Sequence, residues 1–125
     1  MQDDTVRTYC IRVAALFASF IFFVADTRCT QAVQGSTALL QCPAGSVIDE
    51  VAFASYGNPS GECGAYAEGA CHAADTKNVL EDLCVGENSC IISASEALFS
   101  DVGCTPSALT LRAQVSCTGE FRILN

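Results

Sequence analysis

Cysteine spacing is the feature that most constrains what this chain can fold into. The 125 residues include nine cysteines, and a domain of about 100 residues has a thin core that disulfides often supplement. From Cys29 onward, eight cysteines follow at successive spacings of 13, 21, 8, 13, 6, 14 and 13 residues. No Cys-x-x-Cys pair occurs, which disfavours the alternative of a structural zinc site or a thioredoxin-like redox protein. The even number therefore predicts a fully paired framework in an oxidising compartment, with the pairing left open.

The beginning of the chain predicts a removable leader. A polar start over residues 1–12 precedes 13 mainly apolar residues, Val13–Ala25, and polar Asp26–Arg28 follows. A membrane-spanning helix needs about 20 residues, so this length favours a signal peptide over an uncleaved anchor. We expect residues 1–27, with Cys10, to be removed. The remainder is then a secreted, extracellular domain over 28–118 with a short, loosely held tail at 119–125, and without stable membrane insertion.

The net charge of the chain limits which classes of molecule it can bind. Six basic residues stand against fourteen acidic ones, a net charge of −8. An acidic surface repels phosphate backbones and anionic lipids, so nucleic acid is excluded as a partner. Most of the acids need no role beyond solubility. We expect neither a cofactor nor a metal.

Apolar and polar residues alternate in several short segments, which predicts strands. These segments are Thr37–Gln41, Ser46–Tyr56, Cys90–Ala94 and Ala108–Cys117. The second is expected to turn one largely apolar face inward, made of Val47, Asp49, Val51, Phe53 and Ser55. The last is expected to bury Leu109, Leu111, Ala113 and Val115. A turn cluster over 57–61 follows the second strand.

One helix is predicted over residues 75–84. Asp75 is the expected capping residue, and the core-facing positions are expected to be Val79, Leu80 and Leu83. Together with the strands, this predicts an α+β fold: a small disulfide-rich domain of short antiparallel strands, β-sandwich-like, with one main helix.

An enzyme is the competing class, and the sequence disfavours it. The carboxylate pairs Asp49-Glu50 and Glu81-Asp82 are neighbours in sequence, and on a strand such neighbours point to opposite faces and cannot flank one bond. His72 is the single histidine, and no Gly-x-Ser-x-Gly motif accompanies it. We therefore expect no catalytic residues and assign His72 a structural or solvent-exposed place.

Three segments in order, CPAGSVIDEVAFASYG, DLCVGENSCIISASEALFSD and LTLRAQVSC, resemble the SUEL-type lectin domain, the galactose- and rhamnose-binding lectin family. The resemblance covers Gln34 to Cys117. It implies a carbohydrate-binding, non-catalytic domain. It also implies the disulfide pairs Cys29–Cys63, Cys42–Cys117, Cys71–Cys104 and Cys84–Cys90.

The resemblance further implies a carbohydrate site made of Gln34, Tyr56, Asn58, Glu96 and Asp101. Tyr56 and Asp101 match the family pattern, although the segment from Asp101 to the next cysteine is one residue longer here. Elsewhere the chain departs from it: Gln34 replaces a glutamate, Asn58 an arginine, Glu96 an asparagine and Leu109 a lysine. These changes predict a site of altered specificity for a carbohydrate or glycoconjugate. The alternatives are an extracellular protein-interaction module on the same scaffold, or a mainly structural domain.

Overall fold

The computed structural model describes residues 9–16, 19–104 and 108–124, with side chains described over 26–104 and 108–119. Four strands form one antiparallel sheet in the order β1-β2-β6-β4, and two form a second sheet, β3-β5. The elements are β1 (Tyr9–Leu16), β2 (Ser19–Val33), β3 (Thr37–Gln41), β4 (Ser46–Gly57), α1 (Thr76–Cys84), β5 (Ser89–Ser93) and β6 (Thr110–Leu124). The predicted α+β architecture, with antiparallel strands and one helix in the described chain, is confirmed.

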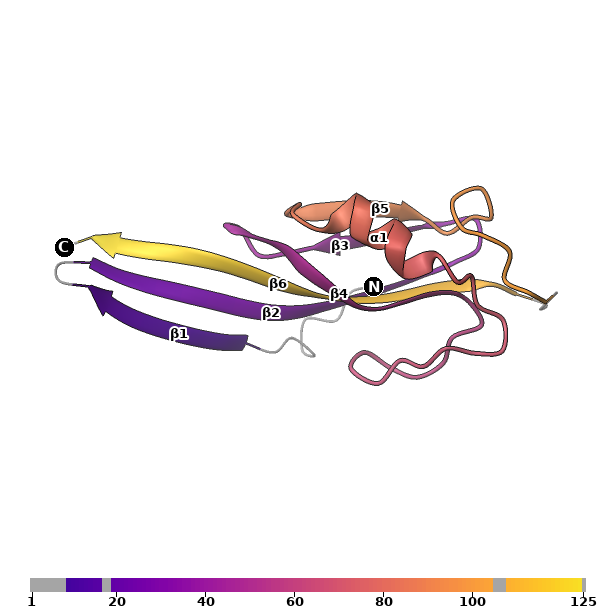
Figure 1. Ribbon diagram of the computed structural model, residues 1–125, viewed down its shortest axis with the longest axis horizontal. Helices are drawn as coiled ribbons and strands as arrows, with labels where there is room; N and C mark the ends of the chain where they lie inside the picture. Colours follow the sequence, from indigo (N-terminus) through magenta and orange to yellow (C-terminus); the bar gives the residue numbers. More distant parts are fainter. Residues whose placement is uncertain (1–8, 17–18, 105–107, 125) are drawn as a thin grey trace.

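The hydrophobic core lies where α1 and the β3-β5 sheet cover the first sheet (Figure 1). Strand β6 supplies its centre. Its residues alternate as predicted, and together with Leu109 just before the strand the inward side chains have at most 5% of their surface exposed: Leu109, Leu111, Ala113, Val115 and Cys117. Ala38 and Leu40 of β3 and Ile92 of β5 close the core from the opposite layer.

Strand β4 departs from the predicted alternation. Its pairing with β6 shifts register between Ile48 and Glu50 and again between Val51 and Phe53. Each β-bulge adds a residue and reverses which side chains face the core. Ile48 is therefore buried, while the expected inward residue Val47 is 40% exposed. The expected inward face was thus wrong for the first part of this strand, and Asp49 and Glu50 are both exposed.

Helix α1 forms where it was predicted, but two of its details differ. Its buried residues are Thr76, Leu80 and Cys84, one stripe at intervals of four residues, and Leu83 falls off that stripe and is 42% exposed. Asp75 makes no side-chain capping bond to the helix. Its carboxylate instead accepts a hydrogen bond from the backbone amide of Ser100, at 3.0 Å.

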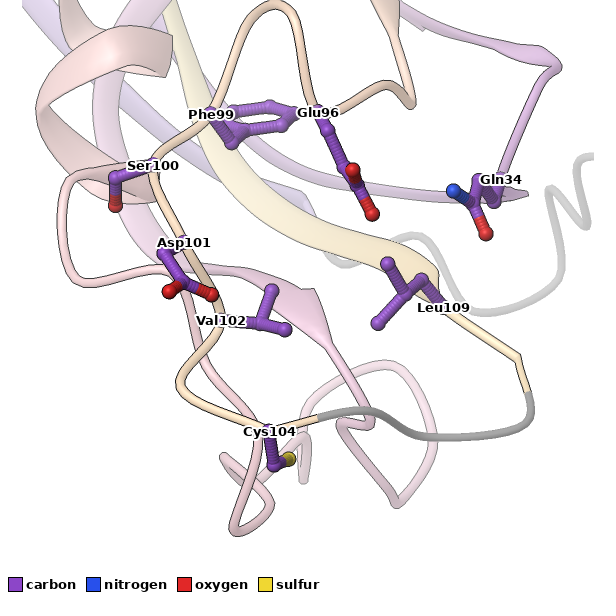
Figure 2. A pocket seen from close by; sticks show the side chains of 8 residues that line it. All are labelled: Gln34, Glu96, Phe99, Ser100, Asp101, Val102, Cys104 and Leu109. Atoms are coloured by element: carbon purple, nitrogen blue, oxygen red, sulfur yellow. The ribbon is translucent and has the colours of Figure 1, made fainter.

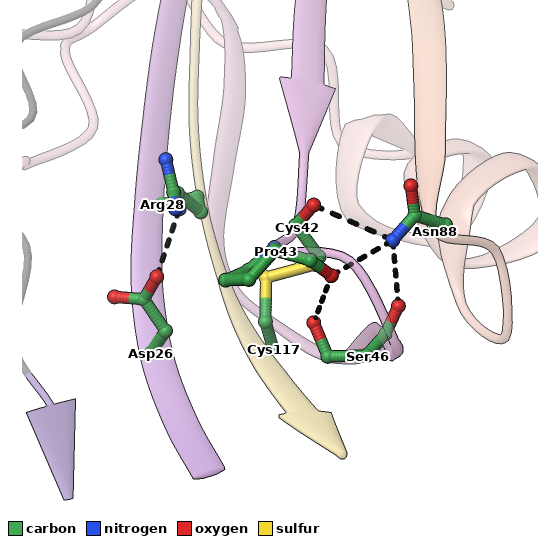
Figure 3. The surroundings of a disulfide bond; sticks show 7 residues. All are labelled: Asp26, Arg28, Cys42, Pro43, Ser46, Asn88 and Cys117. Carbon is green, nitrogen blue, oxygen red and sulfur yellow. Dashed lines mark hydrogen bonds and ion pairs between the residues drawn. A yellow bond between two sulfur atoms is a disulfide. The ribbon is translucent and has the colours of Figure 1, made fainter.

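The four disulfides are those that the resemblance implied: Cys29–Cys63, Cys42–Cys117, Cys71–Cys104 and Cys84–Cys90. The second joins the end of β3 to the middle of β6, deep in the core. Asn88 holds the turn beside it (Figure 3), because its side-chain amide donates to the carbonyls of Cys42, Pro43 and Ser46 at 3.4, 3.0 and 2.8 Å. The turn is thus fixed both covalently and by hydrogen bonds.

The two ends of the chain take part in strands. Residues of the predicted leader lie in β1 and the first part of β2, and residues 118–124 continue β6. Residues 118–124 pair with Ser19–Ala25 of β2, which belong to the predicted leader. This pairing therefore exists only in a chain that keeps its leader, and the loosely held tail of the secreted form stays a prediction. Removal of residues 1–27 also stays a prediction. Within the described residues, no helix has the length and apolar character to cross a membrane.

Candidate functional site

A pocket of about 480 Å³ opens beside the start of β6 (Figure 2). Its wall comes from two parts of the chain that are far apart in sequence: the residue after β2, and the connection between β5 and β6 up to the residue before β6. The lining residues are Gln34, Glu96, Phe99, Ser100, Asp101, Val102, Cys104 and Leu109. Three of the five predicted site residues, Gln34, Glu96 and Asp101, are therefore brought together in one cavity.

Backbone hydrogen bonds place Gln34 at the pocket. Its amide donates to the carbonyl of Leu109 at 2.9 Å, and the next amide, of Gly35, donates to Ala94 at 2.9 Å. Gln34 is thereby held between the start of β6 and the end of β5. In Figure 2 its side-chain amide and the carboxylate of Glu96 extend toward the space beside Leu109.

The loop that carries Glu96 and Asp101 is anchored by Phe99. The Phe99 amide donates to Ser95, which closes a turn, and the ring is only 4% exposed. Further along, the carboxylate of Asp101 accepts from the amide of Gly103 at 3.0 Å. The carbonyl of Val102 accepts from the amide of His72 at 3.0 Å. These contacts present both carboxylates on the pocket wall while the loop's apolar residue is buried.

Tyr56 lies behind the pocket wall and does not line it. The side chain has no exposed surface, and its ring stacks on Phe99 with centroids 5.0 Å apart. Its hydroxyl has no hydrogen-bond partner. Burial, and then the negative charge of Glu96, raise the pKa of Tyr56, so the hydroxyl stays protonated and can donate. Tyr56 therefore supplies an unpaired donor within the electrostatic reach of Glu96.

Asn58 lies outside the pocket lining. Its side-chain oxygen accepts from the amide of Cys71 at 2.8 Å, which closes the base of the loop over 58–71. Gly57 stands at the same base, where a Cβ would overlap the carbonyl of Cys71, so only glycine fits. In this structure, Asn58 fixes a loop next to the site.

Sequence reasoning missed four lining residues: Phe99, Ser100, Val102 and Cys104. The resemblance had marked the Phe99 segment as part of the family pattern, but a single sequence does not show which way a loop side chain points. Within the predicted site, Leu109 counted only as the replacement of a lysine. In the structure it forms an apolar part of the pocket wall. In the described part of the chain, no three His, Cys, Asp or Glu side chains are grouped to hold a metal ion.

The contact between Asp75 and Ser100 predicts an acid dependence of stability. The amide and hydroxyl of Ser100 lower the pKa of Asp75 below its usual 3.8. The contribution of this ionised group is therefore present above about pH 3.8, and it is lost as the pH falls through the lower pKa of the folded state. We expect Asp75→Asn to be less stable than the parent at pH 6, with the difference shrinking as the pH falls below 3.8. Urea unfolding across this range measures it, and a constant difference would contradict the assignment.

The fold and the pocket define a class of small disulfide-linked binding domain. The chain belongs to the D-galactoside/L-rhamnose binding SUEL lectin domain family, whose model matches residues 40–117. The matched part contains Glu96 and Asp101 of the pocket, and Gln34 lies before it.

Three curated plant proteins are similar to parts of this chain. Beta-galactosidase 11 of Oryza sativa subsp. japonica is 46% identical over 83 residues, 66% of this chain and 10% of that protein. Beta-galactosidase 14 of Arabidopsis thaliana is 41% identical over 80 residues, 64% of this chain and 9% of that protein. Beta-galactosidase 6 of Oryza sativa subsp. japonica is 32% identical over 110 residues, 87% of this chain and 13% of that protein. The chain thus spans about a tenth of the length of these relatives.

Proposed function

We propose that this chain is a secreted, non-catalytic carbohydrate-binding domain that holds a sugar in the pocket of Gln34, Glu96 and Asp101. One observation carries the proposal: side chains predicted as a sugar site line a single cavity although they come from separate segments. Its volume of about 480 Å³ is within the usual range for small-molecule sites. Acids and an amide bind hydroxyl groups, and Leu109 and Val102 offer apolar contact to the C–H face of a ring.

A hydrolase is the competing function, because the structure contains a serine, a histidine and a carboxylate in sequence of contact. Ser55, His72 and Glu68 form a chain, with Ser55 Oγ 2.8 Å from His72 Nδ1 and His72 Nε2 3.5 Å from Glu68. A nucleophile must contact its substrate, and Ser55 has no exposed surface. The arrangement supports a structural role for His72, which links β4 to the loop of Val102. It also favours the non-catalytic proposal.

The second candidate is an extracellular protein-interaction module. It is favoured by Leu39 and Ile91, which pair across β3 and β5 and are 53% and 70% exposed. Single exposed apolar residues are ordinary on soluble proteins, so this support is weaker than that of the pocket. Retained glycan binding by an Ile91→Ser variant would separate the two functions.

A glycan array probed with the oxidised protein tests the proposal. We expect selective retention on glycans, and at least about a tenfold loss for Glu96→Ala and for Asp101→Ala, because a hydrogen bond to a charged group contributes about 1.5–3 kcal/mol. Asp101→Asn separates charge from loop geometry, since an amide can still accept from Gly103. Asp82→Asn, which removes an exposed acid on α1 outside the lining, is the matched control. No retention on any glycan, or equal retention by all variants, would overturn the proposal.

A further inference from the structure

The pocket is negatively charged and has no compensating cation in its described lining. Glu96 and Asp101 are both exposed carboxylates, and the other polar side chains there, Gln34 and Ser100, are uncharged. Neither acid forms an ion pair with another described residue.

The nearby basic side chain of Arg112 is engaged elsewhere. Its guanidinium donates to the carbonyl of Gly61 at 3.0 Å and lies 5.9 Å from the centre of the Tyr66 ring. Both contacts belong to the loop after β4, and Arg112 is not part of the lining. Its charge is therefore used to hold that loop and is not placed in the pocket.

A second feature of the same wall is an unpaired hydroxyl behind it. The Tyr56 hydroxyl is fully buried without a hydrogen-bond partner, directly behind Phe99. Leaving such a group unpaired costs about 1–3 kcal/mol. Glu96 is the charged residue that acts on this hydroxyl.

We propose that this pocket prefers sugars carrying a free amino group over neutral sugars of the same shape, and rejects sugars carrying a carboxylate. The inference rests on the proposed carbohydrate-binding function. An ammonium group gains Coulomb attraction from two carboxylates and donates hydrogen bonds that they can accept. A uronic acid adds a third negative charge to the same cavity. Because the pocket is open to solvent, salt screens these terms and the preference is moderate.

Four sugars with one ring configuration test the preference: galactose, galactosamine, N-acetylgalactosamine and galacturonic acid. N-acetylgalactosamine controls for the substituent, because its amide is neutral. By calorimetric or NMR titration at pH 6 and low salt, we expect galactosamine to bind about tenfold more tightly than galactose, a difference of about 1.4 kcal/mol. Galacturonic acid is expected to bind at least tenfold more weakly than galactose. The advantage of the amine should shrink at 0.5 M salt.

Two variants locate the effect. Glu96→Gln removes one of the two charges and should halve the advantage on a logarithmic scale, to about threefold. Asp82→Asn removes one charge from the chain outside the pocket and should leave the ratio unchanged. Equal or tighter binding of galactose, or a ratio unaffected by Glu96→Gln, would overturn the amine preference while leaving carbohydrate binding in place. Absence of any glycan binding on the array would instead overturn the proposed function itself.

Discussion

Replacing Cys42 and Cys117 together by alanine is expected to lower the free energy of unfolding by about 4.5 kcal/mol. The bridge closes a loop of 75 residues, and a cross-link stabilises a domain mainly by restricting its unfolded chain, more so for longer loops. Both cysteines are buried, at 4% and 0% exposure, so their removal also costs core contacts. A small domain has about 5–15 kcal/mol in total. The double variant should therefore unfold at much lower urea concentration than the parent.

The bridge between Cys84 and Cys90 is the matched control. It closes a loop of only 6 residues, for which the same relation gives about 2.2 kcal/mol. Equal losses for the two pairs, or no loss for Cys42 and Cys117, would show that restriction of the unfolded chain is not the stabilising factor.

Much of this fold could be predicted because its patterns are local. The strict alternation of apolar and polar residues before Cys117 predicts a strand, and β6 forms there. The apolar residues at helical spacing after Asp75 predict a helix, and α1 forms there. The disulfide pairing was available only through the resemblance, since spacing does not select partners. Strand β4 shows what alternation alone does not predict. Its bulges near Asp49 and Ala52 depend on its pairing with β6, which is distant in sequence.

The helix cap and the tail illustrate the same limit. Asp75 has the residue type of a cap, but a tertiary donor, the amide of Ser100, takes its carboxylate. Residues 118–124 are predicted as a loosely held tail, yet in a chain that keeps its leader they pair with Ser19–Ala25 of β2. In both cases a partner far along the chain outweighs the local preference, and a single sequence does not reveal that partner.

Part of the candidate site could also be predicted from the sequence, through the family pattern. Gln34, Glu96 and Asp101 meet in one cavity, which a family pattern anticipates because it carries information about spatial neighbours. Asn58 stands at a position that the pattern assigns to an arginine, and here its side chain closes a loop. Tyr56 matches the pattern by residue type, but its burial behind Phe99 comes from packing. Its role in sugar binding therefore needs a test that separates the ring from the hydroxyl.

Substitution of Tyr56 provides that test, and it has the second large expected effect. Tyr56→Ala should lower the free energy of unfolding by about 3–5 kcal/mol, because it removes a fully buried ring and the stacking on Phe99. Tyr56→Phe keeps the ring and removes only the hydroxyl, which has no partner in the folded protein. We therefore expect its stability to equal or slightly exceed that of the parent. Thermal or urea unfolding of both variants measures these differences.

Binding data on the same two variants then decide what the hydroxyl does. Loss of glycan retention by Tyr56→Ala alone says little, since the pocket wall loses its support when the ring is removed. If the hydroxyl donates to Glu96 or to the sugar in the complex, Tyr56→Phe should bind about fivefold to tenfold more weakly, the effect of a hydrogen bond worth about 1–1.5 kcal/mol. Unchanged affinity in this stable variant would reduce Tyr56 to a packing residue and leave recognition to Gln34, Glu96 and Asp101.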